Sequence, residues 1–283
     1  MDIGINGKTA DITIESEETI GELLAGIETW LAGAGFRLSG LEVDGESVDI
    51  GAIPAVCGRN LQGIRRIDVK ASSKPELLLE ALCYAREYLK AYTEASREDG
   101  RRIAEDWNLS AAARFLSAES PPVSRDLAGF FSGEGAEFQR LYALIEERIR
   151  ELTDPRGELA GMEKQVADIV LRLEDLPLDI QTGKDGRAAE TITLFSDITE
   201  KLFRLFYQIG TGQIRSGAPC GGADSPPPGD LSEDFNLALK ELLAAYETKD
   251  VVLIGDLAEY EIAPRLQTLY SSMNVPEAAP SLT

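Results

Sequence analysis

Histidine is absent from this chain of 283 residues, and its absence excludes several kinds of catalytic chemistry. A Ser-His-Asp triad, a Cys-His pair and a zinc site with imidazole ligands all need this residue type. Cysteine is scarce as well: Cys57, Cys83 and Cys220 are too few and too scattered for a four-thiolate site or a disulfide framework. Gly-x-Ser-x-Gly, Cys-x-x-Cys and Gly-x-Gly-x-x-Gly motifs are also missing. We therefore expect no cofactor.

Positive charge is in short supply: Lys and Arg number 28 against 49 Asp and Glu, for a formal net charge of −21. Nucleic-acid affinity comes mostly from basic side chains that neutralise phosphates, so we expect no nucleic-acid partner. An anionic membrane surface is disfavoured for the same reason. Acidity of this kind usually serves solubility, and the alternative is an acidic face that meets a basic partner.

Long apolar runs are also lacking, although the hydrophobic fraction of 43% is enough to fill a core. A membrane span would need about 18 consecutive apolar residues, so we expect none. The N-terminal sequence MDIGING has neither the basic start nor the apolar block of a secretory signal, which favours the cytoplasm.

Residues 1–72 predict a small α/β unit. Asn6-Gly7 and Asp44-Gly45 are pairs suited to tight hairpin turns, and alternating apolar residues flank each pair. Between them, Glu17 to Leu31 has the spacing of a helix with one apolar face. Its predicted buried stripe is Ile20, Leu23, Leu24, Ile27, Trp30 and Leu31. A last strand is expected from Ile64 to Val69.

This order of hairpin, helix, hairpin and strand resembles the β-grasp, or ubiquitin-like, arrangement over about a quarter of the chain. A conjugated modifier ends in two glycines, whereas here Val69 is followed by Lys70-Ala71-Ser72-Ser73. The resemblance therefore implies a docking or scaffold module and not a conjugated tag.

From Lys74 onward the spacing is that of amphipathic helices, which predicts the α+β class. We expect a β-grasp-like domain at 1–72 and an antiparallel helical bundle of six to eight helices at 74–270. Within the bundle, a helical stretch is predicted around 103–116, with Gly100 breaking or kinking the pattern before it. Glycine, proline and serine at 210–231 predict a flexible insertion, and 271–283 a loose tail.

Six apolar residues recur at intervals of three and four: Leu159, Met162, Val166, Ile169, Leu173 and Leu176. Such a heptad-like seam packs against a neighbouring helix at a shallow angle. We interpret it as core within the chain, with a homodimer interface as the alternative. Residues 251–256 fit either a strand or a helix; we favour a helix capped by Asp250 and kinked near Pro264.

Thr182, Gly183 and Lys184 lie in a polar turn before the longest patterned helix and are a candidate anion site. Backbone N–H groups at a helix start attract anions. A P-loop would need Ser or Thr after the lysine, but Asp185 follows, and its charge opposes an anion. We favour a turn between helices that Asp185 caps.

Asp256 and Glu259 share a helix face and are candidate ligands for a hard cation such as Mg²⁺, the alternative being a solvated face. Five aromatic residues are interpreted as core that would mark a docking surface if exposed together: Phe130, Phe131, Phe203, Phe206 and Tyr207.

The sequence favours a non-enzymatic cytoplasmic adaptor or scaffold that binds other proteins, with a homodimer as one arrangement. A second hypothesis is a chaperone-like binder of secreted or flagellar helical subunits, which a long apolar groove between helices would favour. A third is a metal-dependent enzyme built on Asp256 and Glu259.

Overall fold

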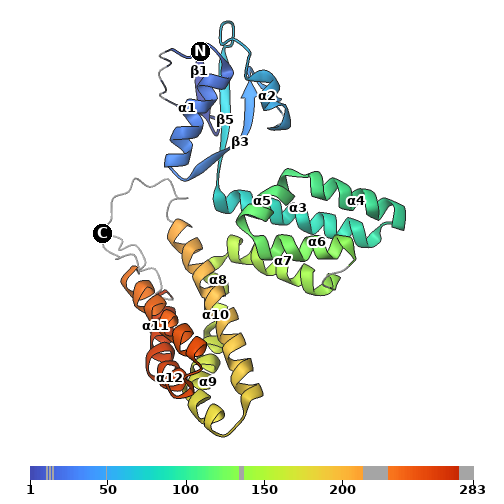
Figure 1. Ribbon diagram of the computed structural model, residues 1–283. Helices are drawn as coiled ribbons and strands as arrows, with labels where there is room; N and C mark the ends of the chain where they lie inside the picture. Colours follow the sequence, from blue (N-terminus) through green and yellow to red (C-terminus); the bar gives the residue numbers. More distant parts are fainter. Residues whose placement is uncertain are drawn as a thin grey trace, which may run out of the picture. The chain divides into compact units, whose positions relative to one another are not determined.

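The computed structural model describes residues 1–10, 12, 14, 16–48, 50–133, 137–212 and 229–273. Cys220, most of the expected insertion at 210–231 and the expected tail beyond residue 273 lie outside these residues. The fold is α+β: a mixed five-stranded sheet is followed by helices (Figure 1). The chain divides into two compact units, Met1–Ile149 (unit 1) and Arg150–Thr283 (unit 2).

The sheet of unit 1 has the strand order β2-β1-β5-β3-β4, in which β1 and β5 run parallel and the other neighbours antiparallel. Both predicted hairpin turns are confirmed. Asn6-Gly7 joins β1 to β2 with φ values of 52° and 76°, and Asp44-Gly45 joins β3 to β4 with 51° and 89°. Two consecutive positive φ values are what a type I′ hairpin requires. The strands are β1 (Asp2–Ile5), β2 (Lys8–Thr9), β3 (Phe36–Val43), β4 (Glu46–Val48) and β5 (Arg66–Ser73).

Helix α1 (Ile20–Gly33) begins at a capping box, in which the Thr19 hydroxyl and the Glu22 carboxylate each accept from the other's backbone N–H. Its buried stripe is the predicted one except for Trp30, which is 62% exposed because it lies at the edge of the stripe. The stripe packs with β3 and β5 in one apolar core. Two short helices, η1 (Ile50–Ala52) and α2 (Ile53–Val56), precede β5.

Five helices follow β5: α3 (Lys74–Glu94), α4 (Arg97–Leu109), α5 (Ala111–Glu119), α6 (Pro121–Ser132) and α7 (Phe138–Thr153). The stretch predicted around 103–116 is helical but divided, because Ser110 caps α5 by accepting from the Ala113 N–H at 3.0 Å. The helical pattern does not break at Gly100. Gly100 lies inside α4, and the chain breaks instead at Ser96, which caps that helix.

Unit 2 is helical: α8 (Pro155–Gly161), α9 (Glu163–Gln181), α10 (Asp185–Gly212), α11 (Gly229–Thr248), α12 (Val251–Asp256), the π-helical turn η3 (Leu257–Ile262) and α13 (Ala263–Met273). The six seam residues are buried together in its core, although the helix breaks at Met162 between α8 and α9. The seam thus packs within the unit.

Residues 251–256 form a helix, and Asp250 caps it by accepting from the Leu253 N–H at 3.1 Å, as predicted. The kink expected near Pro264 stays a prediction; Pro264 lies in the first turn of α13, directly after the π-helical turn that ends at Ile262. Among the described residues, no helix is both long enough and apolar enough to cross a bilayer.

Candidate functional site

The best candidate site is an apolar groove of about 570 Å³ in unit 2, lined by residues of α9, α10, α11 and α12. Most of its lining is aliphatic or aromatic, the composition expected of a site that buries an apolar ligand surface. Apolar side chains from four helices converge on it: Leu173, Leu176, Ile192, Phe195, Phe203, Leu239, Leu242, Leu243, Tyr246 and Ile254.

Helix α10 supplies one wall because its apolar residues recur every three or four positions. Ile192, Phe195, Thr199 and Phe203 fall on one face of the helix and line the groove. They span 12 residues, and the 11 steps between the first and the last cover roughly 16 Å at the rise of an α-helix. The groove is therefore about three helical turns long on this side.

The floor of the groove contains an unpaired hydroxyl. Thr199 is 8% exposed, and its Oγ1 has no hydrogen-bond partner among the described residues. A buried polar group without a partner destabilises a fold by about 1–3 kcal/mol.

The groove continues into an exposed apolar lip at the turn between α11 and α12. Leu243 and Tyr246 line the groove yet are 60% and 55% exposed. Val251, Val252 and Leu253, in the first turn of α12, are exposed as well, whereas Ile254 points into the groove lining. Exposed apolar side chains that adjoin an apolar groove are typical of a binding surface. We call the exposed lining residues Leu243 and Tyr246 the groove lip.

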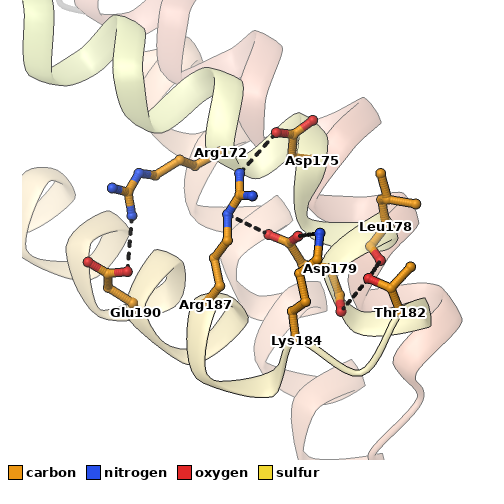
Figure 2. Close-up of polar contacts among 8 residues, drawn as sticks. All are labelled: Arg172, Asp175, Leu178, Asp179, Thr182, Lys184, Arg187 and Glu190. Atoms are coloured by element: carbon orange, nitrogen blue, oxygen red, sulfur yellow. Dashed lines mark hydrogen bonds and ion pairs between the residues drawn. The ribbon is translucent and has the colours of Figure 1, made fainter.

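The α9–α10 turn, which holds Thr182, Gly183 and Lys184, is built around the buried carboxylate of Asp179 (Figure 2). The Asp179 side chain is 2% exposed, and Lys184 Nζ lies 3.3 Å from its Oδ1. Arg187 Nε lies 3.0 Å from Oδ2, an ion-pair distance without the alignment of a hydrogen bond. Gly183 takes the left-handed conformation at φ 71°, and the Thr182 hydroxyl donates to the Leu178 carbonyl at 2.7 Å.

Lys184, from the candidate anion site, and Arg187 on α10 are therefore both already paired with acids. Arg187 also reaches Asp175 at 3.1 Å, and Arg172 lies 3.5 Å from Glu190 on α10 (Figure 2). Asp185, the expected cap, is the first residue of α10 and not the residue before it. This arrangement ties α9 to α10 and leaves little positive charge for an external anion.

Asp179 is a residue that sequence reasoning missed. A signal was present, because Asp179 falls three residues after Leu176 and continues the buried spacing of the seam. An acid on an apolar stripe requires a cation nearby, and Lys184 and Arg187 are the basic residues that follow.

Asp256 lies at the end of α12 and is exposed, whereas Glu259 lies in η3 and is half-buried. In the described part of the chain, no three side chains of the metal-binding types come close enough together to hold an ion. Glu259 instead hydrogen-bonds to Tyr260 and raises the pKa of that phenol.

The five aromatic candidates occupy different environments. Phe131 is buried in unit 1, where its ring packs against Trp107 and against a half-buried Phe130. Phe203 lines the groove and packs against Phe235, with 6.0 Å between ring centroids. In α10 Phe206 is half-buried and Tyr207 is exposed.

Unit 1 has a hollow of about 760 Å³ on its sheet, lined mainly by polar residues. Arg66 and Asp68 face each other there at 2.8 Å, and Asp68 also accepts from the Gly7 N–H at 2.9 Å. Burial raises the pKa of the Asp68 carboxyl, but these two hydrogen bonds outweigh it, so that this pKa lies below its ordinary value. With Arg66 and Asp68 paired to each other, the hollow is a weaker candidate than the groove.

Residues 1–73 match the family described as the TP0873 N-terminal domain, and residues 169–272 match a domain of unknown function, DUF8042. The second match contains all the groove-lining residues. An uncharacterized protein of Treponema pallidum (strain Nichols) is 24% identical over 117 residues, which is 40% of this chain. The chain spans 57% of the length of that relative. No solved structure matches significantly.

Proposed function

We propose that this protein acts as an adaptor that binds another protein in the apolar groove of unit 2. The observation that carries the proposal is the groove with its lip, where Leu243 and Tyr246 line a concave apolar site while more than half exposed. Covering such surface removes it from water and favours association. A cytoplasmic location is part of the proposal.

A helical segment is the form of partner that fits the groove. Recognition of this type uses an amphipathic helix, whose anchors at i, i+3, i+4 and i+7 fill a groove between helices. The α10 wall, about 16 Å long, matches three turns of such a helix.

We infer that the N-terminal sheet is a β-grasp module. The strand order, in which β1 and β5 are parallel neighbours, supports this. Helix α1, which lies between the two hairpins in the sequence, packs in one core with the sheet and supports it as well. A module of this kind is suited to a scaffold role, in addition to the binding role proposed for the groove in unit 2.

The groove also favours the chaperone-like function, in which a secreted or flagellar helical subunit is sheltered before it assembles. The two functions differ in what the bound partner can still do. A chaperone keeps its client from self-assembling, whereas an adaptor leaves the partner free to bind others.

The proposal is tested by capturing partners from the lysate of the source cells with three forms of the full chain: wild type, Leu243→Asn and Leu237→Asn. Both leucines lie on α11 and are similarly exposed, at 60% and 57%, but only Leu243 lines the groove. We expect a stoichiometric partner with wild type and Leu237→Asn, and its loss with Leu243→Asn. Equal capture by all three forms would place the docking surface elsewhere.

A further inference from the structure

We propose that Glu119 is a latch that fixes the orientation of the sheet region, residues 1–73, on the helices of unit 1. When the latch is released, the sheet region turns about the Ser73–Lys74 junction without unfolding. The inference goes beyond groove docking, because every residue of the latch lies in unit 1. It rests on an apolar core that the sheet region does not share, a junction without a linker, and a carboxylate held by two cations.

The sheet region has an apolar core of its own. The buried residues of this core all lie between Ile3 and Ala71, and so do the half-buried residues packed against it. In the described part of unit 1, no apolar residue beyond Ala71 belongs to this core. The helices bury other side chains, among them Leu82 of α3 and Leu116 of α5. The sheet region can therefore turn without exposing its core to water.

The covalent connection between the sheet and the helices is short. Strand β5 ends at Ser73 and helix α3 begins at Lys74, with no residue between them. Ser73 still has the extended conformation of a strand, with φ −71° and ψ 159°, and at the same time caps α3. Hinges are typically a few residues at the ends of elements, where a change of backbone torsion angles turns one part against another. This junction is suited to such a role.

Glu119, the last residue of α5, connects the two parts through ion pairs. Its Oε1 lies 3.1 Å from Arg37 Nη2, and its Oε2 lies 2.5 Å from Lys74 Nζ. Arg37 lies near the start of β3, opposite Ser72 of β5, whereas Lys74 is the first residue of α3. One carboxylate therefore holds a cation of the sheet together with a cation on the helical side of the junction.

The helical side of the latch is the better fixed of the two. The Glu119 side chain is only 12% exposed, and Leu116, one turn earlier in α5, is fully buried. The hydrogen bond from Lys74 outweighs burial and lowers the pKa of the Glu119 carboxyl below its ordinary value, so this group is charged at neutral pH. Arg37, in contrast, is 59% exposed. Salt screens exposed charges, so we expect salt to release Arg37 from Glu119.

The latch is tested by measuring the distance between two spin labels on the full chain. Glu28→Cys on α1 and Ala128→Cys on α6, both exposed positions, carry the labels, and alanine replaces the three native cysteines. We expect one narrow distance distribution at low salt. The distribution should broaden with Glu119→Gln, and also without this substitution at about 1 M salt, where the Debye length is about 3 Å.

Two further variants locate the effect. Arg37→Gln should broaden the distribution as Glu119→Gln does, and the two combined should broaden it no further, because they remove the same contact. Glu98→Gln is the matched control: Glu98 is 82% exposed and pairs with Arg102 of the same helix, so the distribution should stay narrow. A distribution as narrow in Glu119→Gln as in the parent chain would overturn the inference.

Hydrogen exchange separates a change of orientation from unfolding. Ile67 and Val69 of β5 are fully buried in the sheet core, and their amides should exchange within about twofold of the wild-type rate in Glu119→Gln. Much faster exchange of these amides, together with a broad distance distribution, would show that the sheet unfolds and would overturn the inference. A broad distribution in the parent chain at low salt would overturn it as well.

Discussion

At the scale of single residues, the Asp179 carboxylate joins the end of α9 to the start of α10. Lys184 and Arg187 both lie within 3.3 Å of its oxygens, and the Lys184 N–H donates to the Asp179 carbonyl at 2.8 Å. A buried carboxylate is tolerated because these cations accompany it. The turn beside the groove is thereby held in one conformation.

Asp179→Asn should destabilise unit 2 by about 1–3 kcal/mol, because charge-assisted contacts to a buried group are lost. Asp175→Asn is the matched control on the same helix. Its carboxylate contacts the same Arg187 but is 59% exposed, so the loss should stay below about 1 kcal/mol. Denaturant unfolding of the full chain measures both values, and equal losses would contradict the structural role of Asp179.

Glu158 gives the stability of unit 2 a dependence on pH. Burial raises the pKa of this carboxyl, but hydrogen bonds from Lys201 and Arg150, at 2.9 and 2.8 Å, outweigh burial and lower the pKa below its ordinary value. An unfolded glutamate titrates near about pH 4.3. The native state therefore binds fewer protons than the unfolded state in this range.

The stabilisation by Glu158 should be complete above about pH 4.3 and lost as pH falls through the lowered native pKa. Glu158→Gln removes this contribution. We expect unfolding free energies measured from pH 6 downward to fall more steeply for wild type than for Glu158→Gln. Parallel curves for the two proteins would contradict the assignment.

At the scale of elements, two glycines in α1 test how packing limits helix propensity. A Cβ at Gly26 would meet nothing within 4 Å, whereas a Cβ at Gly21 would lie 3.0 Å from Cys57 Cβ and 3.1 Å from its carbonyl oxygen. Gly26→Ala should therefore stabilise unit 1 by about 0.5–1 kcal/mol, because glycine disfavours a helix interior. Gly21→Ala should not stabilise unit 1, because its new Cβ would press against Cys57. Thermal unfolding measures both variants, and an equal gain in stability would contradict the packing of α1 against Cys57.

Element types were predicted well from sequence because burial imposes periodicity, but the breaks between helices were not. The seam continues through Met162 since that residue is buried on the same face, even though the helix ends there. Ser96 caps α4, and Ser110 both ends α4 and caps α5, a local signal that periodicity does not contain. The groove depends on which faces of α9–α12 meet, and a helical period alone does not determine that.

At the scale of the whole molecule, the sheet region has its own apolar core, which residues 3–71 supply entirely. A fragment of residues 1–73 should therefore fold and unfold cooperatively, although domains of this size are marginally stable. Ile67 is fully buried, and Ile67→Ala should remove about 2–5 kcal/mol and abolish the transition. Circular dichroism during thermal unfolding measures both, and an unfolded wild-type fragment would contradict an independent module.

The measurement that tests groove docking most directly is hydrogen exchange of the full chain, alone and with its captured partner. Amides covered by a partner exchange more slowly because local opening is suppressed. We predict slowed exchange at 192–203 in α10 and 239–246 in α11, the segments that form the two walls. Slowed exchange confined to Met1–Ile149 would contradict the account and move the docking site to unit 1.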